Sequence, residues 1–298
     1  MVMAMLKTNR DRLVKQVVMG QVSHPGLAGG YSTTFEGEPK MTPGTAGIKL
    51  NFRVGDSAYG WAADHLEPGV NIRNRGTPRE LSALNAFGCI GNEAKVVSGD
   101  AKGAIGVVTG KHGWTSTFVD FPPAVLQKLS IDDRIQVTGW GIGLAIEGYE
   151  GIRIMSLSPT FFEAMGITEG GSYLKIPVVA EVEAKMMGSG MGGGSGGISD
   201  LGDFDIQSTC PELTQNYGLS KIRSGDLVAV KDMLCHYARG IHPGAITVGI
   251  VSHAASDHTG HGPGVNPLIS AYPGSIKPVI DPKANIAYYL GLRPELKW

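Results

Sequence analysis

The sequence predicts a mainly β protein with few, short helices, built from a small barrel and a larger glycine-rich β domain. Two observations carry this prediction. The first is the 44 glycines among 298 residues, which is about twice the usual share of ~7%. Spread along the whole chain, they indicate many tight turns and bulges. The second is a series of short runs rich in Val, Ile and Thr, each bounded by turn residues, which is typical of β-strands.

Composition and charge exclude several classes of protein. Hydrophobic residues make up 42% and charged residues 18% of the chain, so a full core can form. The net charge is -1 and no basic stripe is present, which argues against a nucleic-acid partner. No apolar run reaches the length of a membrane span, and no secretory signal begins the chain. The three cysteines, Cys89, Cys210 and Cys235, form neither a disulfide framework nor a metal knuckle, so we expect a cytoplasmic protein.

Residues 1–92 are expected to form an irregular region with one well-signalled helix. Residues 13–19 fit a short helix or a strand, and Gly/Pro-rich segments follow. The helix begins after Thr77, which is placed to form a capping box with Glu80, and Pro78 occupies the first helical position. Gly88 is expected to end it.

Residues 93–157 read as a small β-barrel. The segment Gly103–Gly110 is a strand flanked by glycines, a pattern of small barrels, and we therefore predict an SH3-like barrel. A short helix over 123–129 is expected to interrupt it. The predicted strands are 94–97, 105–109, 117–120, 134–138 and 152–157.

Residues 158–298 are expected to form a C-terminal β domain with a glycine run and His/Asp loops. A short helix starts at Ser158-Pro159 and ends at Gly166. Residues 173–187 predict one long strand, because alternate positions are apolar. Further strands are predicted over 227–230 and 245–253.

The glycine run at 188–197 contains Gly-x-Gly-x-x-Gly, with Gly190 and Gly193 as its second and third glycines. No helix start follows it and no Gly-Lys-Ser/Thr is present, so it is neither a dinucleotide fingerprint nor a P-loop. Two interpretations stay open. The run is a lid or a backbone nest in which Gly190 and Gly193 bind a ligand, or it is a solvated linker-like loop.

Asp203 and Asp205 follow the run directly. If Phe204 lies in a strand, the two carboxylates share a face and can bind a cation or perform acid–base catalysis. We predict them as the catalytic pair. The alternative is that one caps a turn and the other is solvated.

The stretch 252–265 holds three histidines after a strand that looks buried, and loops at strand ends commonly display sites. We predict His253, His258 and His261 as ligands of a divalent metal, Zn, Mn or Fe, which neutral imidazoles with carboxylates suit. The alternative is that they cap turns. The pair Asp64-His65 and His112 are the N-terminal candidates to join this site, with Asp64 and His112 as ligand-binding residues.

Cys89 follows the capped helix at its C-terminal end, where the helix dipole disfavours a thiolate. A structural role is therefore expected, with a nucleophile as the alternative. No Gly-x-Ser-x-Gly elbow is present to support serine hydrolase chemistry.

Several strings resemble an uncharacterised prokaryotic family catalogued as domain of unknown function 4438. They are Asp64-His65-Leu-Glu67-Pro68-Gly69, Cys89-Ile-Gly-Asn92, Lys111-His112-Gly113, Gly202-Asp203-Phe-Asp205 and Gly260-His261-Gly262-Pro263-Gly264. The resemblance implies a mainly β fold with a small barrel and supplies no activity. A weaker resemblance, at Gly196-Gly197-Ile-Ser-Asp200 and Gly225-Asp226, is to acetamidase/formamidase-type metal-dependent amidases. There the sequence departs from the Gly-Asp-x-His string of those enzymes.

The function is therefore uncharacterised, and three hypotheses follow. The first is a metal-dependent hydrolase of a small amide or another polar metabolite, in which the metal activates water. The second is a non-enzymatic module that binds a small molecule or an ion. The third is a structural homo-oligomer whose β edges pair between subunits. We expect a small-molecule ligand and a homo-oligomer as the partners.

Overall fold

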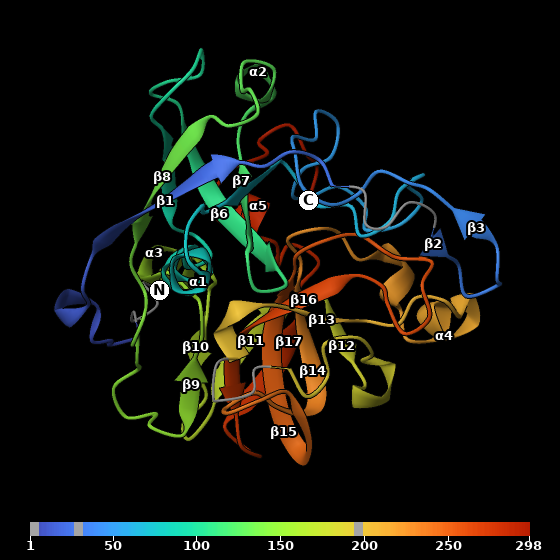
Figure 1. Ribbon diagram of the computed structural model, residues 1–298. Coiled ribbons are helices and arrows are strands. Elements are labelled where there is room, and N and C mark those ends of the chain that lie inside the picture. The colour runs from blue at the N-terminus through green and yellow to red at the C-terminus, as the bar shows by residue number, and fades with distance from the viewer. Residues whose placement is uncertain (1–5, 27–31, 194–198) are drawn as a thin grey trace.

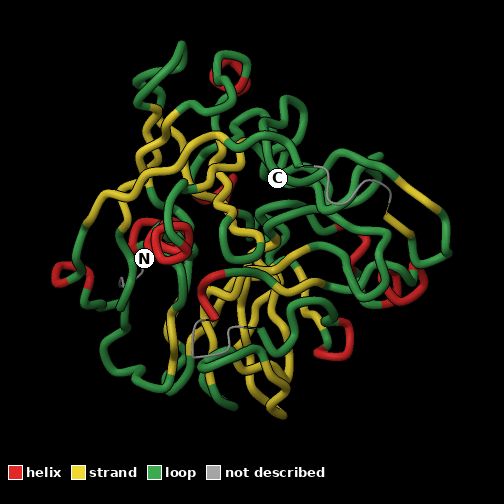
Figure 2. The backbone as a smooth tube through the Cα atoms, in the orientation of Figure 1, coloured by secondary structure: helices red, strands yellow, loops and turns green. Residues whose placement is uncertain are grey.

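The computed structural model describes residues 6–26, 32–193 and 199–298. It confirms a mainly β protein, in which a barrel lies above a larger sheet in the view of Figure 1 and loops make up much of the rest (Figure 2). The strands are β1 (Gln16–Val22), β2 (Ser32–Thr33), β3 (Pro39–Lys40), β4 (Val70–Arg73), β5 (Glu93–Val96), β6 (Ile105–His112), β7 (Ser116–Asp120), β8 (Arg134–Gly139), β9 (Ile152–Ile154), β10 (Thr168–Glu169), β11 (Leu174–Val178), β12 (Ala180–Val182), β13 (Phe204–Asp205), β14 (Leu227–Leu234), β15 (Gly240–Val251), β16 (Gly264–Ala271) and β17 (Ile276–Ile280).

The barrel is closed, with strand order β1-β4-β7-β6-β5-β8, and β1 pairs antiparallel with β8 to complete the ring. Its composition differs from the one expected for residues 93–157. Two of its strands, β1 and β4, come from the region before residue 93, because the ring needs them to pair the free edges of β8 and β7. The expected last strand, β9, instead pairs with β16 of the larger sheet.

The larger sheet has the order β12-β14-β15-β16-β13. The single strand expected over 173–187 is divided into β11 and β12, because the chain changes sheets there. β11 runs parallel to β17, and β12 runs parallel to β14. A 3-10 helix over Ala184–Met186 then leads from β12 to the glycine run, whose first residue, Gly188, donates from its N–H to the Asp205 carbonyl of β13.

The α-helices of the described residues are short, and four 3-10 helices of three residues each accompany them. The α-helices are α1 (Pro78–Phe87), α2 (Pro123–Leu126), α3 (Pro159–Ala164), α4 (Pro211–Asn216) and α5 (Ile286–Tyr289). The capping box predicted for α1 is confirmed, since Glu80 N–H donates to the Thr77 hydroxyl and Thr77 N–H donates to the Glu80 carboxylate. Among the parts of the chain described, no helix has the length and hydropathy needed to cross a bilayer.

Buried amides join the barrel to the larger sheet. Asn266 of β16 receives a hydrogen bond from Lys111 N–H at 2.7 Å and donates to the Lys111 carbonyl at 3.0 Å, so it pairs with β6 as another strand would. Asn85 of α1 donates to the carbonyls of Gly113 and Leu201. These bonds hold the end of β6 against the loops of the C-terminal half, and the polar chemistry of the chain meets at this junction.

Candidate metal centre

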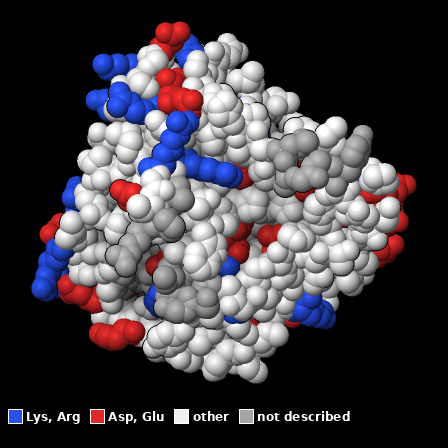
Figure 3. Space-filling view, in the orientation of Figure 1, with Lys and Arg blue, Asp and Glu red and all other residues white. Residues whose placement is uncertain are grey.

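Five histidines and four carboxylates gather between the barrel and the larger sheet. Each comes from the end of a strand or from a loop beside one, so neighbouring secondary structure fixes its position. Acidic side chains are visible at the centre of this face in the space-filling view (Figure 3). The members are Asp64, His65, Glu67, His112, Asp203, Asp205, His253, His258 and His261.

One set of three ligand-type side chains consists of His112, Asp203 and His253. Asp203 Oδ2 lies 2.9 Å from His253 Nε2, and the two imidazole rings have their centroids 4.5 Å apart. Gly113 N–H donates to Asp203 Oδ1, which holds that carboxylate in place. The other ring nitrogen of His253, Nδ1, bonds to the Ala254 carbonyl at 2.9 Å. His253 therefore presents Nε2 toward the centre.

A second set consists of His65, Asp205 and His261. His65 Nε2 lies 2.9 Å from His261 Nδ1, and the same His261 atom lies 3.0 Å from Asp205 Oδ2. The other oxygen of Asp205, Oδ1, lies 3.6 Å from His253 Nε2 in the first set. Asp205 is thus shared by the two sets, as a bridging carboxylate would be.

Two further carboxylates hold the rings from outside. Asp64 Oδ2 accepts from His65 Nδ1 at 2.7 Å, and Glu67 Oε1 accepts from His112 Nδ1 at 2.8 Å. Metal-binding histidines almost always use their second nitrogen in this way, because the bond fixes tautomer and ring orientation. His65 also has φ 47, a left-handed conformation that is uncommon outside glycine and occurs often at functional sites.

Charges within the cluster perturb its pKa values strongly. Burial alone would lower the pKa of His65, but hydrogen bonds and attraction from Asp205 and Asp64 raise it to about 10. Burial raises the pKa of Asp64, yet its bond to His65 outweighs this and holds the pKa of that carboxyl below its usual value. Without metal, His65 is therefore a cation between two anions at neutral pH.

The first set behaves in the same way. Burial opposes the charge on His112, but Asp203 and Glu67 outweigh it and raise the pKa of His112. Burial likewise opposes ionisation of Asp203, but His112 and His253 outweigh it and lower the pKa of that carboxyl. The carboxylates of this set thus favour the positively charged form of His112.

The space around these atoms fits a metal ion. His253 Nε2 is buried and has no partner in hydrogen-bonding geometry, although Asp203 is close. Gly264 of β16 faces this position, and a Cβ there would lie 2.2 Å from His253 Nε2 and 2.6 Å from Asp203 Oδ2. A glycine at 264 therefore leaves open the space that an ion bound by these two groups would occupy.

The centre opens into a pocket of about 220 Å³. Both ligand sets contribute to its floor, and Trp114, Arg239 and the described part of the glycine run form its walls. This volume is below the ~300–1,000 Å³ of sites for drug-sized ligands, so the pocket suits a small metabolite.

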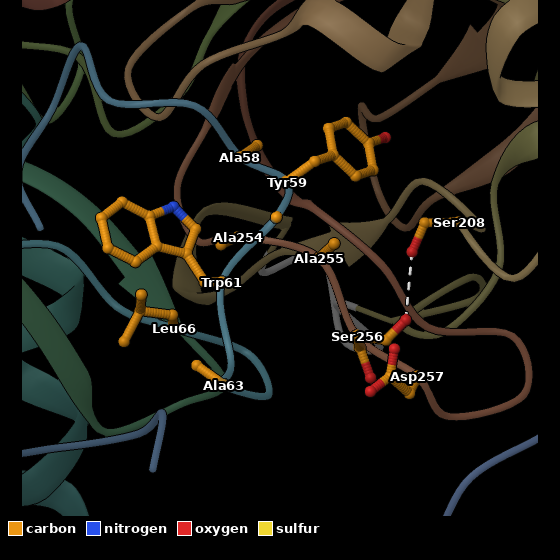
Figure 4. Close-up of a pocket in the computed structure, with 11 residues that line it drawn as sticks. Ala58, Tyr59, Trp61, Ala63, Leu66, Ser208, Ala254, Ala255, Ser256 and Asp257 are labelled. Carbon is orange, nitrogen blue, oxygen red and sulfur yellow. Dashed lines mark hydrogen bonds between the residues drawn. The ribbon is translucent and has the colours of Figure 1, made fainter. Parts of the chain in front are cut away.

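A second, smaller pocket of about 150 Å³ lies beside residues 254–257. Figure 4 shows Trp61 and Leu66 on one side of it, with Ser208, Ser256 and Asp257 on the other. No histidine lines this pocket among the described residues, and it therefore lacks the ligand set of the first.

The structure brings most of the predicted site residues together. Asp203, Asp205, His112, His253 and His261 all belong to the two sets. Phe204 lies in a strand, as the shared face of the two aspartates requires.

The predicted residues Asp64 and His258 form a third potential ligand group, together with His65, at the edge of the centre. His258 is at the outer edge, where Nδ1 is 4.0 Å from Asp64 Oδ2 and Nε2 contacts the Ser32 hydroxyl. Gly190 and Gly193 line the pocket. The end of the glycine run, 194–198, lies outside the described residues.

The sequence analysis named the pair Asp64-His65 as a candidate to join the site but gave no role to Glu67 or Arg239. The string Asp64-His65-Leu66-Glu67 could have signalled Glu67, since it places two carboxylates around one histidine. Arg239 has no local signal, because its neighbours in the fold are backbone carbonyls.

The other candidates serve the fold. Burial raises the pKa of Cys89 to about 11, so the nucleophile alternative is not supported. Asp226, from the amidase-like string, is buried and bonds to Arg223 and Asn285. Asp200 pairs with Arg153.

Comparison with known proteins gives a consistent result. The model described as "Domain of unknown function (DUF4438), N-terminal" matches residues 31–163, and that described as "Domain of unknown function (DUF4438), C-terminal" matches residues 164–290. A solved chain described as "Crystal structure of TM1086" is 40% identical, with a TM-score of 0.91, over 96% of this chain and 99% of that one. No curated protein matches significantly.

Proposed function

Because the chain belongs to the DUF4438 family, whose descriptions assign no activity, we propose a function from its own site: a hydrolase of a small amide or related polar metabolite that uses a pair of divalent metal ions. The ions would be held by His112, Asp203 and His253 on one side and by His65 and His261 on the other, with Asp205 shared.

One observation carries this proposal: each set offers three protein ligands and opens into a pocket. Structural zinc sites are usually closed by four protein ligands, whereas catalytic sites keep a position for water or substrate. A pair of sites that share a carboxylate matches the two-metal arrangement of several hydrolase classes. A site built only to retain an ion would have no need of the pocket.

The chemistry of the ligand set narrows the choice of metal. Imidazole and carboxylate ligands without thiolate suit Zn, Mn or Fe, and the three cysteines take no part in either set. A bound ion of this kind supplies a polarised carbonyl and a bound water whose pKa falls toward ~7.

The chain's own residues prepare this site. Asp64 and Glu67 fix the rings of His65 and His112 so that each directs Nε2 inward. Asp205 holds the two sets at a fixed separation through its two oxygens. Few groups need to reorganise when substrate arrives, which is the condition for effective electrostatic catalysis.

Elemental analysis of untagged, chelator-free protein tests the proposal. We expect about two transition-metal ions per chain, one for each ligand set, and loss of both in Asp205→Asn. His236→Ala is the matched control, because His236 bonds to the Ser270 carbonyl away from the centre. The loaded protein is then assayed against a broad panel of small amides.

The outcomes separate the hypotheses. Metal in the parent and the control, loss in the Asp205 variant and turnover of an amide support the proposal. Bound metal with no turnover across the panel would leave the ion-binding module. Absence of metal after reconstitution with Zn²⁺, Mn²⁺ and Fe²⁺ would refute the centre itself.

A further inference from the structure

The pocket beside the centre contains a buried guanidinium that pairs with no carboxylate among the described residues. Arg239 is only 5% exposed and lines the pocket. Its hydrogen bonds go to main-chain carbonyls: Nη1 donates to Gly190 and Asp203, and Nη2 donates to Ser199. A buried positive charge normally has an anionic partner. Burial lowers the pKa of Arg239 although the charges of Asp203, Asp200 and Asp205 oppose this, so the compensation of its charge is incomplete.

Part of the guanidinium's hydrogen-bonding capacity is unused. Nε is buried without a partner, and Nη2 has two hydrogens but bonds to a single carbonyl among the described residues. These are the two atoms that Arg53 of the same chain uses to bind both oxygens of Asp120, at 2.9 and 2.6 Å. Arg239 therefore has one edge, Nε and Nη2, whose hydrogen bonds are incomplete, and such an edge has the geometry to bind a planar carboxylate.

Arg239 lies next to the candidate metal centre. Its Nη1 bonds at 2.7 Å to the carbonyl of Asp203, whose side chain belongs to the first ligand set. An anion held by Arg239 would therefore lie beside the centre. The glycine run packs directly against the guanidinium, since a Cβ on Gly193 would lie 2.5 Å from Nη1.

From these observations we propose that Arg239 binds a carboxylate of the substrate, so that the substrate class is a small amide bearing a carboxylate group. The assignment of the bound molecule as a substrate rests on the proposed hydrolase function. The binding of a carboxylate by Arg239 does not depend on that function. One guanidinium can bind either a carboxylate or a phosphate through two hydrogen bonds, but its single charge balances that of a carboxylate and not the larger charge of a phosphate. The pocket volume of about 220 Å³ limits the ligand to a small molecule.

The test measures binding by calorimetry on the full chain at fixed metal content. The probes are N-acetylalanine, its neutral amide N-acetylalaninamide, and inorganic phosphate. The variants are Arg239→Lys, which keeps the charge but not the fork, and Arg239→Gln. Arg75→Gln is the control, because Arg75 pairs with Asp132 on the barrel surface.

We expect the parent and the control to bind the carboxylate probe at least ~10-fold more tightly than the amide probe. Charge-assisted hydrogen bonds of this kind are worth about 10- to 100-fold. Both Arg239 variants should lose this preference while their metal content and the affinity for the neutral probe stay unchanged. The lysine variant guards against misfolding, since it retains a donor for the carbonyls.

Two results would overturn the carboxylate assignment. One is a preference that survives in both folded Arg239 variants, and the other is an Arg239-dependent preference for phosphate over the carboxylate probe. Failure of the hydrolase function is recognised separately. Arg239-dependent binding of the carboxylate probe without turnover of any amide would support the anion site and reject the hydrolase. Turnover of an amide without a preference for the carboxylate probe would support the hydrolase and reject the anion site.

Discussion

Substitution of Gly264 by alanine should remove one metal ion from the centre. A Cβ at this position would lie 2.2 Å from His253 Nε2 and 2.6 Å from Asp203 Oδ2. Ordinary contacts between heavy atoms are about 3.5–4.0 Å, so the imidazole must retreat by more than about 1 Å. Metal–ligand distances tolerate only ~0.2 Å, and the first set would no longer hold an ion.

We expect the affinity of that set to fall about 100-fold, at the upper end of the effects seen when ligand-orienting groups are lost, or ~2.7 kcal/mol. The assay is metal content after dialysis against a graded chelator series, with unfolding of the metal-free protein measured alongside. The content should fall from about two ions to about one per chain, leaving the set of His65, Asp205 and His261.

Gly249→Ala provides the matched control. A Cβ there would lie 2.5 Å from Val265 Cγ1 and 2.7 Å from the Asn266 carbonyl, so the same sheet is overpacked without contact with a ligand atom. Both variants should lose about 1–3 kcal/mol of stability without metal. The reasoning is refuted if Gly264→Ala keeps the parent's metal content and affinity, or if Gly249→Ala loses metal equally.

Three further predictions concern single groups. Glu67→Gln should weaken metal binding about 10- to 100-fold, because Glu67 orients His112. Calorimetry with Zn²⁺ measures this, and an affinity equal to that of the parent would contradict the prediction. The pKa of His65 is raised to about 10, so its contribution to the stability of the metal-free protein is complete below about pH 6.5 and is lost as the pH rises toward 10. Urea unfolding of the parent and His65→Asn should show the difference between them shrinking over this range, and a constant difference would count against the ion pairs. The pKa of Cys89 is raised by burial to about 11, so alkylation of the native protein at neutral pH should reach the partly exposed Cys210 first; equal rates by peptide mass spectrometry would disprove the inert assignment.

The sequence predicted local features well. The capping box of α1 and the strand runs between residues 93 and 157 depend on neighbouring residues, and both formed near the expected positions. The shared face of Asp203 and Asp205 also follows from one local fact, the extended conformation of Phe204.

Closure of the barrel could not be predicted in the same way. Gln16 pairs with Gly139, and no periodic pattern near residue 16 specifies a partner so distant along the chain. β4 is equally ambiguous, since a run of four residues fits several structures when it stands alone. Strand pairing depends on the other strands, and a single sequence does not encode it locally.

The candidate centre also contains residues that local sequence predicts and residues that depend on distant partners. The two aspartates at 203 and 205 and the three histidines at 253, 258 and 261 each form a short local cluster, and the two clusters were predicted as one group. His65 lies in an irregular segment with a positive φ, and its role depends on His261, from which 196 positions separate it. Arg239 acquires its setting from backbone carbonyls, which every sequence possesses.

The contribution of both halves of the chain to one centre has a consequence for biosynthesis. His65 and His261 are 196 positions apart, and translation proceeds at about 5–20 residues per second. At those rates His65 leaves the ribosome roughly 10–40 s before its partner exists. During that interval the nascent barrel carries imidazoles and carboxylates with no counterpart, open to whatever cation is most abundant. If the centre holds metal ions as proposed, their loading would be a late step in maturation, set by the metal supply of the cell once both halves of the centre have been made.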